Sequence, residues 1–158
     1  MELVVGIGIL AILSALLIVI LNPFEQFKKA DDTKRKSDLA QIQRALEAYY
    51  QDFGMYPDDN NATSTYKIVV GGEAIEWGSD WSPYIEVLPS DPTSTKKYIY
   101  KSDGQSYWLY ASLDRGIRDI QICHADGSSC DGVPVGIYCG LSASDVCNYG
   151  VSSPNTSP

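Results

Sequence analysis

The sequence has 158 residues and a formal net charge of −8 at pH 7, with 12 Lys and Arg against 20 Asp and Glu. This acidic balance argues against nucleic acid as the main partner, because binding a phosphate backbone needs clustered cations. The only candidate basic patch in the later part of the chain is Lys96-Lys97. Once an N-terminal helix is set aside, roughly a hundred residues remain, which suffice for one modest core and not for two.

The chain begins with an uncharged apolar run, Leu3 to Leu21, directly after a single acid, Glu2. At about 1.5 Å of rise per residue, this run is just long enough to cross the hydrocarbon of a bilayer. A charge deep in a membrane helix costs about 3 kcal/mol, so Glu2 is either held at the membrane interface or paired with a cation buried beside it. The residues alone leave both interpretations open.

The dipeptide Asn22-Pro23 predicts a kink, because proline lacks the amide donor and crowds the preceding turn, while helical signals resume at once. Acids then precede bases by four residues, which predicts a solvated helix surface. On this pattern the basic run Lys34-Arg35-Lys36 is helix surface balanced by nearby aspartates. The expected pairs are Glu25–Lys29, Asp31–Arg35 and Asp32–Lys36.

An apolar stripe follows at steps of three, four and seven residues, and it must dock on something apolar. Gly54, followed by Tyr56-Pro57, predicts the end of the helix. The whole pattern indicates one helix of about fifty residues, roughly 75 Å long if continuous. The stripe consists of Leu39, Ile42, Leu46, Tyr49, Tyr50 and Phe53.

The rest of the chain is predicted to be a β-rich head, so the fold class is α+β: a small antiparallel sheet packed on the amphipathic half of a long kinked helix. We expect strands at 66–70, 98–101, 106–112 and 117–123, joined in part by hairpin turns at 102–105 and 114–116. Residues 81–88 are predicted to form a short helix that stops at Pro89. From 125 onward Gly, Ser and Pro predict loops, with a flexible tail at 152–158.

All four cysteines, Cys123, Cys130, Cys139 and Cys147, fall in the loop-rich end of the chain. Their even number favours two disulfides formed outside the cytoplasm. We expect the pairs Cys123–Cys130 and Cys139–Cys147, which close short loops containing Gly and Ser. A crossed pairing that ties the tail to the last strand stays open. Zinc binding with His124 is disfavoured, because the gaps between the cysteines exceed those of zinc knuckles.

Catalytic machinery is not indicated, so the chain is not expected to be an enzyme. His124 is the only histidine, and any serine or cysteine nucleophile would depend on that single base. The acidic runs Asp58-Asp59 and Asp126 with Asp131 lack the ordered spacing of a calcium loop. No cofactor and no metal site are predicted.

The ordered series of segments resembles the type IV pilin family, which includes the major pseudopilins of type II secretion. The similar segments are Glu2 to Leu13 with the later proline, Ala45 to Pro57 at the helix exit, and Tyr84 to Pro92, Tyr98 to Tyr100 and Tyr107 to Asp114 in the head. The resemblance covers roughly residues 1 to 114. Only Met1 precedes Glu2, as expected for a processed or truncated chain, and Pro23 lies about one turn farther from the glutamate than the family's usual proline.

The resemblance implies a structural subunit of an extracellular type IV pilus, a helical homopolymer that starts in the cytoplasmic membrane of a bacterium. Adhesion to host or other cell surfaces or twitching motility is the expected role. A prepilin peptidase, an assembly ATPase and a platform protein are implied partners, and the N-terminal amine is usually methylated. The alternatives are a major pseudopilin of a type II secretion system and a membrane-anchored surface binding protein that never polymerises.

Within this family, Glu2 would neutralise the N-terminal amine of a neighbouring subunit, and Leu3 to Leu21 would form the main contact between subunits. The expected organisation is a membrane and filament-core helix at 1–23, an amphipathic helix at 24–53, a head at 54–123, and disulfide-bonded loops with a flexible tail at 124–158. The residues expected to act in assembly are Glu2, Leu3, Val4, Ile7, Leu10, Leu13, Leu17 and Pro23.

Overall fold

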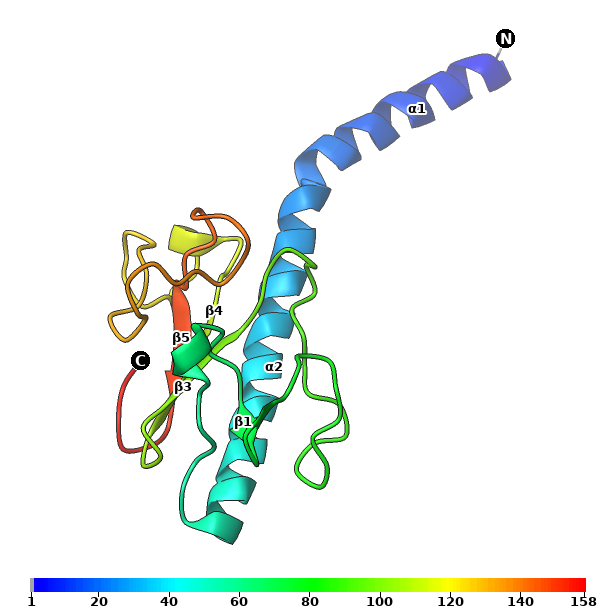
Figure 1. Ribbon diagram of the computed structural model, residues 1–158. Helices are drawn as coiled ribbons and strands as arrows, with labels where there is room; N and C mark the ends of the chain where they lie inside the picture. Colours follow the sequence, from blue (N-terminus) through cyan, green and yellow to red (C-terminus); the bar gives the residue numbers. More distant parts are fainter. Residues whose placement is uncertain (1) are drawn as a thin grey trace.

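The computed structural model describes residues 2–158, without the side chains of residues 15–21 and 63. Helix α1, Glu2–Leu21, projects away from the rest of the molecule, and helix α2, Pro23–Phe53, lies along the head, residues 54–158 (Figure 1). The expected α+β class is confirmed in its coarse features, namely the long helical N-terminus, the small antiparallel sheet and two disulfides.

The two helices are separated by one residue, Asn22, whose backbone lies in the left-handed region with φ 39° and ψ 72°. Pro23 follows as the first residue of α2, where its missing amide is tolerated because the first amides of a helix have no intrahelical acceptor. Figure 1 shows α1 running at an angle to α2 beyond this point. The two helices therefore meet at the dipeptide Asn22-Pro23.

Within the described part of the chain, no helix combines the length and the apolar composition that crossing a bilayer requires. The expectation that 3–21 spans a membrane therefore stays a prediction. Part of that run, together with Leu17, lies among the side chains outside the described residues.

Helix α2 buries the first part of the apolar stripe that the sequence predicted, whereas Tyr49 and Tyr50 are half-buried and Phe53 is 58% exposed. Leu39, Ile42 and Leu46 are fully buried, because steps of three and four residues place them on one face of the helix. The helix ends at Gly54, whose φ of 71° favours glycine and whose N–H donates to the carbonyl oxygen of Tyr50 at 2.8 Å. Docking of the second half of the long helix on the head is thus observed.

The head contains two small antiparallel sheets. Strands β1, Val69–Val70, and β2, Glu73–Ala74, form a short hairpin, and the main sheet has the order β3-β4-β5. Its strands are β3, Ile99–Ser102, β4, Tyr107–Ala111, and β5, Tyr149–Ser152. Two 3₁₀ turns, η1 and η2, span Asn61–Thr63 and Gly116–Arg118.

The third strand of the main sheet comes from a different segment than the sequence predicted. Residues 117–123 form no strand; they begin in η2 and continue as irregular chain. The edge of β4 that this segment was expected to occupy pairs instead with β5, with Leu109 opposite Val151. The end of the chain is correspondingly held, because Trp108 Nε1 donates to the carbonyl oxygen of Ser157 at 3.0 Å. The expectation of a flexible tail over 152–158 stays a prediction.

The short helix predicted at 81–88 was also wrong. Trp81 and Ile85 instead form an isolated antiparallel bridge that closes a turn. Pro83 lies inside this turn, where it has no amide to donate to a helical hydrogen bond. The turn is fixed to the end of α2 by the hydroxyl of Tyr84, which donates to Asp52 Oδ2 at 2.9 Å.

Tyrosine rings fill much of the core between α2 and the main sheet. Tyr98, Tyr100 and Tyr107 are at most 1% exposed, and each hydroxyl has a partner, as a buried phenol requires. Tyr98 donates to Asp38 Oδ2 at 2.8 Å and Tyr100 to the carbonyl oxygen of Pro57 at 2.7 Å. The rings therefore supply both apolar area and fixed polar links between helix and head.

Two disulfides hold the loops that follow the sheet. Cys123 is bonded to Cys130 and Cys139 to Cys147, with Cα atoms 5.2 and 5.1 Å apart. This is the pairing that the loop lengths favoured, and it excludes the crossed alternative. Three of these cysteines are buried in a second small core with Ile99, so the disulfide-bonded loops pack against the outer face of the sheet.

Candidate assembly surface and the network that orients it

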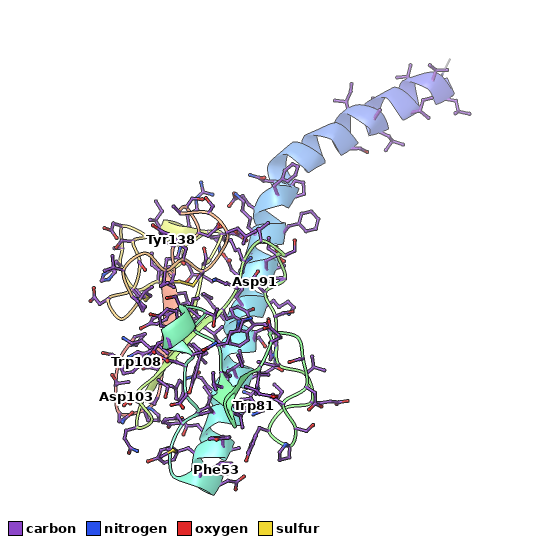
Figure 2. The ribbon with its side chains drawn as sticks, viewed as in Figure 1. Phe53, Trp81, Asp91, Asp103, Trp108 and Tyr138 are labelled. Carbon is purple, nitrogen blue, oxygen red and sulfur yellow. A yellow bond between two sulfur atoms is a disulfide. The ribbon has the colours of Figure 1, made fainter. Side chains whose placement is uncertain are left out.

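The projecting helix α1 exposes apolar side chains on every side. Its described Leu, Ile and Val side chains have between 52% and 78% of their area accessible, and Figure 2 shows them pointing away from the helix with no other segment beside them. Soluble monomers rarely expose an apolar patch of this extent. The exposed side chains are Leu3, Val4, Val5, Ile7, Ile9, Leu10, Ile12 and Leu13.

The residues predicted to act in assembly lie on this helix or at its end. Glu2 is the first residue of α1 and is exposed, while Pro23 opens α2 and is exposed as well. The described side chains of this set on α1 are all exposed. Burying one large aliphatic side chain stabilises an assembly by about 1.5–3 kcal/mol, so covering α1 yields a large driving force for association.

The direction of α1 depends on how α2 is fixed to the head, and the strongest link is Arg35. Its guanidinium is fully buried and uses all five N–H donors. Nε and Nη2 donate to the two oxygens of Asp91 at 2.9 and 3.0 Å, and Nη2 also donates to Thr93 at 3.0 Å. Nη1 donates to Asp32 at 2.9 Å and to Asp114 at 2.6 Å.

The carboxylates around Arg35 connect three parts of the molecule. Asp32 is on α2 and accepts the backbone N–H groups of Asp114 and Arg115 at 2.8 and 3.0 Å. Asp91 lies in the loop before the main sheet, next to α2 in Figure 2. Lys96 adds a second cation by donating to Asp114 Oδ1 at 2.6 Å. We call these five charged groups, Asp32, Arg35, Asp91, Lys96 and Asp114, the Arg35 network.

The electrostatics of the network favour its charged forms. Burial by itself raises the pKa of Asp114, but hydrogen bonds from Lys96 and Arg35 outweigh it and hold that pKa below its ordinary value. Burial likewise opposes the charge of Arg35, whereas the hydrogen bonds that it donates to Asp91 and Asp114 raise its pKa. Removing one partner of such a buried group costs about 3–5 kcal/mol, so the network fixes α2 on the head.

This network was not predicted from the sequence, because the pattern of acids and bases placed Lys34-Arg35-Lys36 on a solvated helix surface. Arg35 pairs with Asp32 rather than Asp31, and Lys36 pairs with Asp119 rather than Asp32. A signal was present, since position 35 lies four residues before Leu39 and therefore on the buried stripe. A charged residue in register with an apolar stripe indicates a buried partner of opposite charge.

Comparison with known families agrees with the helix and the first part of the head. The family model described as type II secretion system (T2SS), protein G matches residues 22–116. The matched range includes α2, the Arg35 network, β3 and β4, and it ends before the disulfide-bonded loops. No curated protein and no solved structure gives a significant match.

Proposed function

This chain belongs to the type II secretion system protein G family, pseudopilins within the type IV pilin-like proteins, and from that premise we propose that it is the repeating subunit of a pseudopilin filament in a secretion system. Membership of the family implies assembly with further copies and with other components of secretion or pilus machinery. The family match favours the pseudopilin over the extracellular pilus that the sequence analysis placed first.

The observation that carries the proposal is the projecting helix α1. Its apolar side chains are exposed on all sides, so they need either lipid or other helices around them. In the proposed filament the α1 helices of many copies form the central bundle and the heads face outward. Before assembly the same helix is held in the cytoplasmic membrane.

The role of the chain in this proposal is structural and involves no catalysis. Glu2 is proposed to pair with the N-terminal amine of a neighbouring copy and so to set the axial register. The energy for extension is proposed to come from a separate ATPase acting through a platform protein, after a prepilin peptidase has processed the chain.

A second candidate is the subunit of an extracellular pilus with a role in adhesion or motility. The observation that favours it is the set of disulfide-bonded loops beyond residue 116, outside the family match. These loops expose Val135 and Leu141, with 104% and 83% of their area accessible. Exposed apolar side chains on rigid loops are suited to contact with another surface.

The test is to detect the polymer and then its role. The chain is expressed in its own cell, and envelope fractions and sheared surface material are imaged by electron microscopy with an antibody to the head. Filaments labelled along their length support the proposal, and labelled membrane without filaments contradicts it. Loss of protein secretion on deletion of the gene identifies a pseudopilin, whereas loss of surface attachment or movement with normal secretion identifies a pilus.

A further inference from the structure

The chain contains two sequons of the form Asn-x-Ser/Thr, and the proposed function uses neither of them. They are Asn61-Ala62-Thr63 and Asn155-Thr156-Ser157. Such a triplet is an acceptor for N-linked glycosylation when it lies on the surface of a protein outside the cytoplasm. The two disulfides indicate that compartment, because bridges of this kind form and persist in oxidising surroundings.

The first sequon lies on an exposed loop of the head. Asn61 begins η1, and both Asn61 and Ala62 are exposed. The two ends of the loop are joined by a bridge in which the N–H of Val69 donates to the carbonyl oxygen of Asp58 at 2.8 Å. In Figure 1 the turn lies beside the main sheet, away from α1. An enzyme can therefore reach Asn61 without opening the core of the head.

The loop is held on the sheet through its backbone and a buried carboxylate. Asp59 is 5% exposed. Its Oδ1 accepts the N–H of Asn61 at 3.0 Å, and its Oδ2 accepts the N–H of Ser102, at the end of β3, at 3.2 Å. Among the described residues, the side chain of Asn61 forms no hydrogen bond. The amide nitrogen of Asn61 is therefore free to react while the loop keeps its position.

The second sequon differs in exactly this respect, because its amide group is part of the fold. Asn155 Nδ2 donates to the carbonyl oxygen of Gln105 at 3.2 Å and to Ser106 Oγ at 3.0 Å. Asn155 Oδ1 accepts the hydroxyl of Ser153. A sugar on Nδ2 would replace one of its protons and crowd these contacts, which fasten the end of the chain to the turn between β3 and β4. The structure therefore favours Asn61 over Asn155 as the acceptor.

A polar hollow beside Asn61 offers room for an attached sugar. The hollow has a volume of about 370 Å³ and is lined in part by Asp58, Asn61, Ser102 and Asp103. Asp58 and Asp103 are exposed, and ionised carboxylates accept hydrogen bonds from hydroxyl groups. A sugar joined to Asn61 can therefore be accommodated and can find hydrogen-bond acceptors for its hydroxyls.

We propose that Asn61 is a site of N-linked glycosylation, modified outside the cytoplasm by an oligosaccharyltransferase. Nδ2 forms a bond to the anomeric carbon of an oligosaccharide carried on a polyprenyl diphosphate. The bond from that carbon to the diphosphate oxygen breaks, its electron pair leaves with the diphosphate, and Nδ2 gives up one proton to a base of the transferase. Thr63 is the hydroxyl residue that the acceptor triplet requires. The modification does not depend on polymerisation of the chain.

The test is mass spectrometry of the chain purified from its own cell. The intact mass is expected to exceed that of the polypeptide by one oligosaccharide, and tandem spectra of its peptides are expected to place that increment on Asn61. Asn61→Gln and Thr63→Ala are each expected to lose the whole increment. Thr63→Ser, which keeps the sequon, and Asn155→Gln are the controls and are expected to retain it. Circular dichroism of each variant verifies the fold.

Three results would overturn the assignment. One is a wild-type chain in which Asn61 is unmodified. Another is an increment that is lost in Asn155→Gln and kept in Asn61→Gln, which would move the site to the second sequon. The third is an increment that survives both substitutions, which would identify modification at a different kind of residue. Filament formation is scored separately by electron microscopy, so each of these results leaves the proposed function unaffected.

Discussion

Helices α1 and α2 both depart from the usual arrangement of a soluble protein, in which apolar side chains are buried and charged side chains are exposed. Helix α1 exposes Leu3 at 78% and Leu10 at 63%, whereas α2 buries Arg35 completely. The head with α2 is a complete unit, because its one buried guanidinium has all its partners inside the chain. Helix α1 is incomplete, because its described apolar side chains, up to Leu13, are exposed. The contrast separates a region built for a fixed orientation from a region built for association.

The largest expected effect is on polymerisation, and it comes from deleting helix α1. A chain lacking residues 2–21 keeps the Arg35 network, the sheet and both disulfides, so its head is expected to fold. Without α1 the main driving force for association is gone, and polymerisation is expected to be abolished. Sedimentation velocity should then show a soluble monomer, and a truncated head that still polymerises contradicts the division into two regions.

The head with α2 is expected to be destabilised most by a substitution of Arg35. Arg35→Ala leaves Asp32, Asp91 and Asp114 without their shared cation, and is expected to lower the free energy of unfolding by about 3–5 kcal/mol. Denaturant unfolding of the head measures the loss. Arg44→Ala is the matched control, since Arg44 is exposed and a surface substitution is expected to change stability by at most about 0.5 kcal/mol. Equal effects of the two substitutions would exclude a special role for the network.

The disulfides stabilise the part of the head that has least core of its own. Replacing Cys139 and Cys147 by serine removes a bridge between residues eight apart in the chain, and by the chain-entropy estimate costs about 2.5 kcal/mol. Hydrogen exchange is expected to accelerate in the loops and in β5 more than in α2. Uniform acceleration across the head would show instead that the bridge supports the whole fold.

A smaller effect is expected from acid, through Asp114. Because its folded-state pKa is depressed, its contribution to stability is fully present above the unfolded-state pKa of about 3.9 and is lost as the pH falls through the lower folded-state pKa. Asp114→Asn is therefore expected to flatten the decline in stability below about pH 4. Urea unfolding at several pH values tests this, with the exposed Glu73→Gln as the control. An unchanged slope in Asp114→Asn would contradict the pairing.

The effect of Glu2→Ala is expected to fall on the polymer alone. The substitution removes the proposed partner of a neighbouring N-terminal amine, while the apolar area of α1 remains. The head should unfold at the wild-type temperature, and the amount of filament should be reduced. Normal filament yield from Glu2→Ala would remove this residue from its proposed role.

The parts of the fold that sequence patterns predicted are those with strong local signals. The stripe containing Leu39 and Leu46 identified the docked face of α2, and two strand-length segments separated by a turn signal at 102–105 identified β3 and β4. Short loops between cysteines favoured the disulfide pairing that the structure contains. In each case the information lies within a few residues of the chain.

The parts that were missed depend on contacts between distant segments. Strand β5 has only four residues and a glycine, so its structure comes from the edge of β4 rather than from its own propensity. The Arg35 network joins residues 56 and 79 positions apart, and no local pattern reveals such a link. Its only local trace is the placement of Arg35 on the buried stripe of α2.

The central claim, that association depends on α1 and orientation on the head, is tested most directly by a cryo-electron microscopy reconstruction of the filament. The account predicts α1 helices packed against one another along the axis, with the heads outside and the Arg35 network intact in each copy. A filament built from contacts between heads, with α1 outside the axial bundle, would contradict it.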